Sequence, residues 1–133
     1  MPAIYTKEWY DELKGLLNRN EDVAKNAPRG KYKALAELRG DAQSPYLADG
    51  KKLFFVVHLD DGKCTDYFEV PAAVFEGVAA GLVDPVEAGL KGTIKITGDM
   101  RILIKHAELV NVVNEIYSRE VETTWPKGKP PYS

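Results

Sequence analysis

The sequence predicts one domain that combines helices with a β-sheet. The chain has 133 residues, close to the usual size of a single domain, so it can close one hydrophobic core but hardly two. Hydrophobic residues make up 44% of it and charged residues 29%, proportions typical of a folded globular protein and not of a disordered or coiled-coil one. Segments with helical spacing of apolar residues alternate with segments rich in β-branched and aromatic residues. We therefore treat residues 1–133 as one domain.

The charge balance and the cysteine count narrow the classes of function. Lys and Arg number 18 and Asp and Glu 20, so the net charge of -2 leaves no excess of positive charge for general binding to nucleic acid. The single cysteine, Cys64, excludes an intrachain disulfide and fits a reducing compartment. Residues 1–9 lack the pattern of a signal peptide, and the longest apolar run, residues 53–57, is far shorter than the roughly 20 residues that span a bilayer. We expect a cytoplasmic protein without an integral membrane segment.

Residues 6–17 predict an amphipathic N-terminal helix. Thr6 is a typical N-cap. The apolar residues that follow share one helical face: Trp9, Leu13, Leu16 and Leu17. The polar segment 18–29 ends in proline and glycine, so we expect a loop there, with room for one more helical turn.

Two β-rich runs predict an antiparallel hairpin. Residues 53–59 and residues 63–70 flank Asp61-Gly62, a pair typical of a two-residue hairpin turn. The first run is apolar at almost every position, which predicts a strand buried on both faces, whereas the second mixes polar with apolar residues and predicts a peripheral strand. Alternation of polar and apolar residues predicts two further strands, at residues 32–38 and 93–97, and turn-forming residues predict a surface loop at 41–52.

The C-terminal half adds helices to these strands. Pro71 suits a helix start, and the apolar residues after it fall on one face: Val74, Phe75, Val78, Ala79 and Leu82. Asp84-Pro85 combines a cap with a proline and predicts a brief second helix. Asp99 is placed to cap a long helix over residues 100–119. The proline-rich tail, residues 123–133, is expected to be irregular, with Trp125 anchoring its first part.

Candidate catalytic residues are few. His58 and His106 lie about fifty positions apart, without the spacing of a metal site. Across the predicted hairpin Cys64 lies diagonal to His58, which gives a Cys–His dyad little support. The acidic residues of this hairpin are better explained as a solvated turn and strand face: Asp60, Asp61, Asp66 and Glu69. A small enzyme that uses Cys64 or His106 is therefore the third of the functions we consider, and we expect neither a metal nor a cofactor.

The most informative pattern lies in the last helix. Wound at about 100° per residue, its apolar residues spread over an arc of roughly 220°, wider than a helix needs to cover a sheet. The helix can be packed between the sheet and the N-terminal helix, which geometry alone favours, or one flank can line an internal apolar cavity. In the second case His106 and Asn114, which lie in the same arc, offer sparse polar groups to the head group of a ligand. For His106 alone, a structural role is the favoured explanation.

Motifs in the C-terminal half resemble those of a known family. Residues 75–81, FEGVAAG, place a Gly-x-x-x-Gly spacing in a helix, and Asp84-Pro85 follows it. Residues 92–100, GTIKITGDM, form a Gly-led strand that runs into Gly-Asp-Met at a helix start. With these motifs, residues 53–116 resemble the sterol carrier protein (non-specific lipid-transfer protein) domain family.

This resemblance implies a fold, a function and a set of site residues. The fold is α+β, with an about five-stranded, mixed and mostly antiparallel sheet covered on one side by helices that enclose an apolar tunnel. The function is carriage of sterols, fatty acids, fatty acyl-CoA or phospholipids without catalysis, with at most transient contact with membranes. Together with the helical periodicity, it leads us to expect these residues along the tunnel: Phe75, Val78, Leu82, Met100, Leu103, His106, Ala107, Val110, Asn114 and Tyr117. The alternative is a non-catalytic accessory module that presents lipid-like substrates to a separate enzyme.

Overall fold

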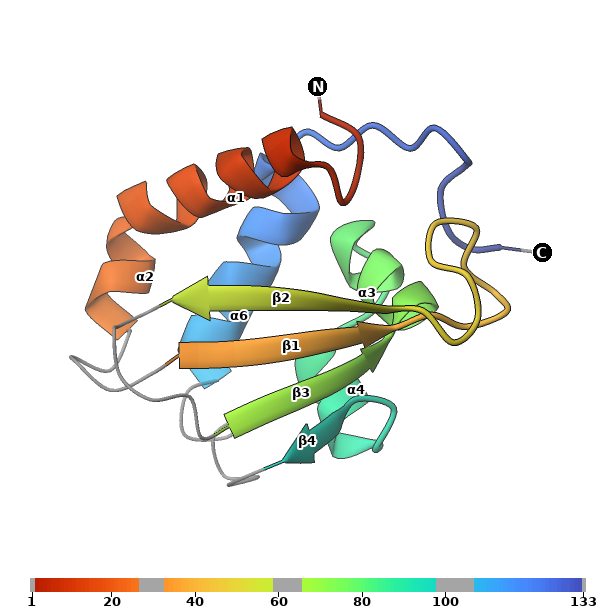
Figure 1. Cartoon of the computed structure of the whole chain (residues 1–133). Helices are drawn as coiled ribbons and strands as arrows, with labels where there is room; N and C mark the ends of the chain where they lie inside the picture. Colours follow the sequence, from red (N-terminus) through yellow and green to blue (C-terminus); the bar gives the residue numbers. More distant parts are fainter. Residues whose placement is uncertain (1, 27–32, 59–65, 98–106, 133) are drawn as a thin grey trace.

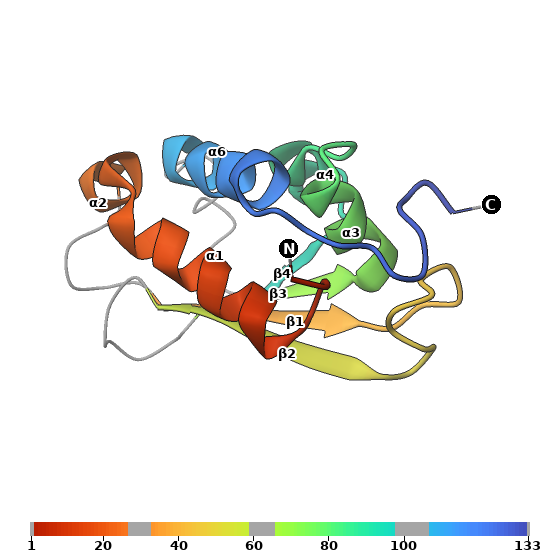
Figure 2. The ribbon, with the colours of Figure 1, turned by 90° about the horizontal axis from the view of Figure 1, so that it is seen from above.

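The fold is a mixed sheet with helices packed on one of its faces. The computed structural model describes residues 2–26, 33–58, 66–97 and 107–132. The sheet has four strands in the order β2-β1-β3-β4 (Figure 1). Seen along the edge of the sheet, the helices of the described residues lie on one side of it (Figure 2). This is the α+β class that the sequence analysis expected, with four described strands where about five were predicted.

The strands do not pair in the order of the chain. They are β1 (Lys33–Arg39), β2 (Lys52–His58), β3 (Asp66–Pro71) and β4 (Lys95–Thr97). β1 is antiparallel to β2 and parallel to β3, and β4 is antiparallel to β3. Leu38 of β1 lies opposite Leu53 of β2 and Val70 of β3, and its side chain is fully buried. β1 is thus a central strand, paired with β2 on one side and with β3 on the other.

The predicted hairpin between residues 53–59 and 63–70 is wrong. β1 lies between β2 and β3, so these two strands are not neighbours. The expectation that the first of them is buried on both faces is wrong as well, because β2 lies at an edge of the described sheet and Phe54 is 58% exposed. The hairpin geometry that related Cys64 to His58 therefore no longer applies, and residues 59–65 lie outside the described part of the chain.

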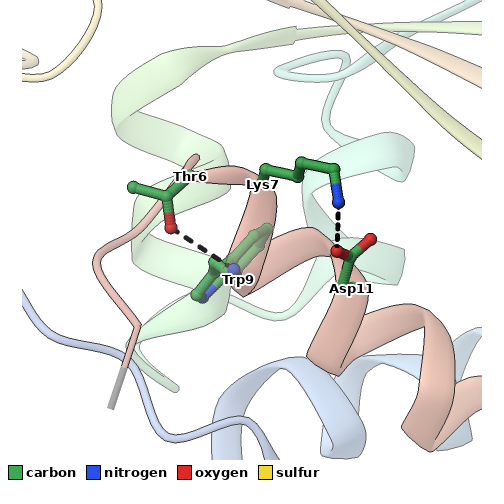
Figure 3. A network of polar contacts seen from close by, with 4 residues as sticks. All are labelled: Thr6, Lys7, Trp9 and Asp11. Atoms are coloured by element: carbon green, nitrogen blue, oxygen red, sulfur yellow. Dashed lines mark hydrogen bonds and ion pairs between the residues drawn. The ribbon is translucent and has the colours of Figure 1, made fainter.

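The N-terminal helix forms as predicted. α1 (Lys7–Arg19) is capped by Thr6, whose Oγ1 accepts a hydrogen bond from the backbone N–H of Trp9 at 3.3 Å (Figure 3). Trp9, Leu13 and Leu17 are buried on the face turned toward the core. Lys7 and Asp11 form an ion pair at 2.8 Å on the exposed side of the helix, which contributes little to stability. A short second helix, α2 (Glu21–Asn26), follows where a loop with one further turn was expected.

Two short helices connect β3 with β4. α3 (Ala72–Ala79) begins directly after Pro71, and α4 (Pro85–Leu90) is capped by Asp84, whose side chain accepts a hydrogen bond from Val86 N–H at 3.0 Å. Gly81 ends the first of these helices with a φ of 77°, a left-handed conformation that glycine adopts without strain. α3 is buried on almost every side, since six of its eight residues are buried.

The last helix changes its hydrogen-bonding pattern near its end. α6 (Ala107–Glu115) continues into a π-helical turn, η1 (Ile116–Glu120), in which Val121 N–H donates to the carbonyl oxygen of Ile116 at 3.0 Å. Ile116 is fully buried in the core. The predicted start of this helix, from Asp99 to residue 106, lies outside the described residues.

The chain ends run beside one another. Ala3 and Thr124 form a parallel bridge, and Ile4 N–H donates to the carbonyl oxygen of Thr124 at 3.1 Å. Figure 1 shows the tail continuing from there past the loop that joins β1 to β2. The ring of Trp125 lies edge-on to Tyr46 of this loop, with the ring centroids 6.0 Å apart.

Candidate functional site

The described site residues gather on α3 and on the last helix. Phe75 and Val78, both on α3, are buried. α3 contacts η1, the end of the last helix, and α4 contacts α6. Leu82 lies beyond the end of α3 and is 58% exposed, which places it at the surface.

Several predicted site residues are not described. Met100, Leu103 and His106 lie in the segment outside the described residues. Of Ala107, Val110 and Tyr117 only the backbone is described, in α6 and η1. Their role along a tunnel therefore stays a prediction.

Asn114 has an unusual environment. Its side-chain oxygen, Oδ1, is buried and has no hydrogen-bond partner among the described residues. One turn further along the helix, the hydroxyl of Ser118 donates to the backbone carbonyl oxygen of Asn114 at 2.8 Å. Ser118 also locates this flank of the helix, because a Cβ on Gly81 would lie 3.8 Å from the Ser118 Cβ. The flank that carries Asn114 thus lies beside the segment that joins α3 to α4.

A buried carboxylate on α3 organises a second polar cluster, which the sequence analysis did not find. Glu76 is completely buried, and its oxygens accept hydrogen bonds from three hydroxyl groups. Tyr5 Oη donates at 2.6 Å, Ser44 Oγ lies 2.8 Å from both carboxylate oxygens, and Tyr132 Oη donates at 2.7 Å. We call these four residues the Glu76 cluster. It ties the N-terminal segment, the β1–β2 loop and the C-terminal tail to α3.

The local sequence carries only a weak signal of this cluster. A single acid within the apolar run of residues 72–79 indicates a buried polar group. Its partners lie 71, 32 and 56 positions away, so no spacing rule connects them. The β1–β2 loop reaches the same helix a second time, since Asp41 Oδ2 accepts a hydrogen bond from Ala73 N–H at 3.3 Å.

The tyrosines of the cluster are held in their protonated form. Burial, followed by the charge of Glu76 and the hydrogen bond to it, raises the pKa of the Tyr5 hydroxyl far above its usual value. Burial and the hydrogen bond to Glu76 also raise the pKa of Tyr132. Both hydroxyls are therefore donors at neutral pH. With its acceptors occupied by donors from the chain, the Glu76 carboxylate is placed to hold the fold together.

The described residues offer neither a metal-binding group nor a membrane-spanning helix. Within residues 2–26, 33–58, 66–97 and 107–132, no group of three or more His, Cys, Asp or Glu side chains could hold a metal ion. No helix of the described chain is both long and apolar enough to cross a membrane.

Comparison of the fold with solved structures decides its type. Sequence comparison alone finds no matching family model and no matching curated protein. By structure, a conserved hypothetical protein from Thermus thermophilus, described as possibly a sterol carrier protein, matches with a TM-score of 0.69 over 94% of each chain, at 19% sequence identity. A crystal structure of sterol carrier protein 2 matches with a TM-score of 0.67 over 90% of this chain and 99% of that one, also at 19% identity.

The chain has the sterol carrier protein fold. Sterol carrier protein 2 from Yarrowia lipolytica, in its apo form, shares this fold with a TM-score of 0.57 at 14% identity, over 83% of this chain and 89% of that one. The resemblance that the sequence analysis drew from residues 53–116 is thus confirmed at the level of the fold, and it extends over nearly the whole chain.

Proposed function

We propose that this chain binds a lipid in an apolar site between α3 and the last helix and carries it without catalysis. The observation that supports this most is the sterol carrier protein fold, matched over 94% of the chain. The candidate ligands are those that the resemblance implies, namely sterols, fatty acids, fatty acyl-CoA and phospholipids. We place this carrier in the cytoplasm, which fits its single cysteine.

The residues of the proposed site suit an apolar ligand. Phe75 and Val78 are buried on α3, where the ring of Phe75 also packs on Tyr5 and Trp9. The undescribed residues of the last helix are proposed to form the facing wall. Burial of a hydrocarbon chain contributes roughly 0.8 kcal/mol per CH₂ group, so a long acyl chain or a ring system binds without many polar contacts. Apolar walls distinguish similar hydrocarbons only weakly, so we expect a broad range of ligands.

Delivery of a lipid requires contact with a membrane or with a protein that accepts the lipid. Leu82, which precedes α4, and Leu90, its last residue, are 58% and 61% exposed. Exposed leucines next to the proposed site suit transient contact with a membrane surface. The accessory-module alternative, in which the chain presents its lipid to a separate enzyme, uses the same site.

A titration with a fluorescent fatty acid tests this proposal. We expect saturable binding with one site per chain, and weaker binding for Phe75→Ala because the ligand loses an aromatic contact. Phe54→Ala is the matched control, since Phe54 is exposed and lies on the sheet face opposite that of its neighbour Leu53, which packs against the core. Urea unfolding of each variant separates lost binding from lost folding. Absence of saturable binding by the wild-type protein would contradict the proposal.

A further inference from the structure

We infer that Asn114 selects the head group of the ligand, and that the ligand presents a neutral hydrogen-bond donor to it, either a hydroxyl or an amide N–H. This inference rests on the proposed function and narrows its ligand class. It predicts a preference for alcohol-type or amide-type lipids over fatty acid anions.

The side-chain oxygen of Asn114 is buried without a hydrogen-bond partner among the described residues. An amide oxygen accepts up to two hydrogen bonds, and native proteins rarely leave such an atom buried without one. Two other buried oxygens without a hydrogen bond, on Glu37 and Glu69, are neutralised by ion pairs with Lys52 and Arg39. The Asn114 oxygen has no such partner in the described part of the chain. A donor from outside the protein would complete it.

Asn114 lies on the side of the last helix that faces away from the residues packed on the core. Val112 and Ile116, which pack on the core, are each two residues away, so at about 100° per residue Asn114 lies about 160° around the helix from both. The exposed residues Asn111, Glu115 and Glu108 lie about 60°, 100° and 120° from Asn114, on one side of it. Asn114 is therefore at the margin of the exposed stripe, on the flank that Ser118 brings next to Gly81 and the α3–α4 segment.

The backbone just after Asn114 departs from a regular α-helix. The helix changes from α- to π-helical at Ile116, a type of turn that occurs often at functional sites. The hydroxyl of Ser118 donates a hydrogen bond to the backbone carbonyl oxygen of Asn114, with Oγ and O 2.8 Å apart. The backbone acceptor at this position is thus occupied, and the side-chain oxygen is left as the acceptor for a ligand.

The unpaired acceptor determines which head groups can pair with it. An ionised carboxylate only accepts hydrogen bonds, so it cannot pair with the Asn114 oxygen and is repelled by it. A hydroxyl or an amide N–H donates and removes the mismatch. Glu76 cannot supply or take this bond, because its oxygens are already engaged by Tyr5, Ser44 and Tyr132.

Two probes with the same hydrocarbon part test the inference: 12-(1-pyrenyl)dodecanol and 12-(1-pyrenyl)dodecanoic acid, each titrated at pH 8, where the free acid is ionised. We expect the wild-type protein to bind the alcohol about tenfold more tightly than the acid, the size of one net hydrogen bond. Asn114→Leu should remove this preference by weakening only the alcohol. Asn111→Leu, at an exposed position one turn away, is the control and should keep the preference.

The outcomes separate this inference from the proposed function. Equal binding of both probes by the wild-type protein, or tighter binding of the acid, would overturn the role of Asn114 and leave lipid binding standing. Binding of neither probe would overturn both. If Asn114→Leu does not fold, Asn114→Asp replaces it; the added negative charge should weaken the acid further while the alcohol keeps an acceptor.

Discussion

Glu76 and Asn114 are both polar side chains with buried oxygens, but these oxygens differ in their hydrogen bonding. Glu76 lies in the middle of an almost wholly buried helix and receives hydrogen bonds from three hydroxyls that come from distant parts of the chain. The Asn114 oxygen is buried without any partner among the described residues. A fully paired group of this kind stabilises the fold, whereas an unpaired one costs stability and calls for a ligand or a water molecule.

Removal of the Glu76 carboxylate should have the largest effect. Glu76→Leu leaves the hydroxyls of Tyr5, Ser44 and Tyr132 without their acceptor in a buried site. We expect the free energy of unfolding to fall by about 3 kcal/mol, measured by urea unfolding. Glu87→Leu is the control: Glu87 is an exposed acid of α4 that forms an ion pair with the exposed Lys91, so less than about 1 kcal/mol is expected. A Glu76→Leu variant as stable as the wild type would show that the cluster does not hold the fold.

The pH dependence of stability should report the buried tyrosine of the same cluster. The pKa of Tyr5 is raised in the folded state, so above its ordinary value of 10.0 the unfolded chain loses a proton that the folded chain keeps. The contribution of Tyr5 to the free energy of unfolding is therefore fully present below pH 10. It falls as the pH rises beyond 10, by about 1.4 kcal/mol per pH unit for this one group. Tyr5→Phe should lower the overall stability but make this decline less steep. Urea unfolding between pH 9 and pH 11.5 checks the slope, and an unchanged slope would mean that Tyr5 ionises as freely as in the unfolded chain.

Replacement of Asn114 should have the smallest effect and the opposite sign. Without lipid, Asn114→Leu removes an unpaired buried oxygen and adds a better helix former, so we expect a gain in stability of about 1 kcal/mol. Asn111→Leu carries the same change in helix propensity at an exposed position of the same helix and should gain less. The difference between the two variants in the free energy of unfolding measures the cost of the unpaired oxygen. A loss of stability in Asn114→Leu greater than in Asn111→Leu would mean that the wild-type oxygen is already paired.

The features that could be predicted from the sequence are local ones. Thr6 and Asp84 cap α1 and α4 through residues two or three positions away, and Pro71 precedes α3 directly. The arc that contains Asn114 also follows from the period of a single helix. Such signals depend on neighbours in the chain and survive without knowledge of the tertiary structure.

The features that were missed or mispredicted depend on distant contacts. The Asp61-Gly62 pair favours a hairpin, but β1 pairs with both strands and separates them, and β1 carries no local sign of a parallel partner. Glu76 finds its donors in three segments that only the complete fold brings together. The predicted tunnel residues fall between these cases: Phe75 and Val78 are buried as a helical face requires, whereas Leu82 lies past the helix end and is exposed.

The most direct test of the central claim is the identity of the molecule that the purified protein carries. The protein is denatured, extracted with organic solvent, and the extract is analysed by mass spectrometry beside an equal amount of the Phe75→Ala variant. We predict about one lipid per wild-type chain, with a hydroxyl or amide in its head group, and less in the variant. A wild-type extract without lipid, together with no saturable binding of a fluorescent fatty acid, would contradict the carrier function.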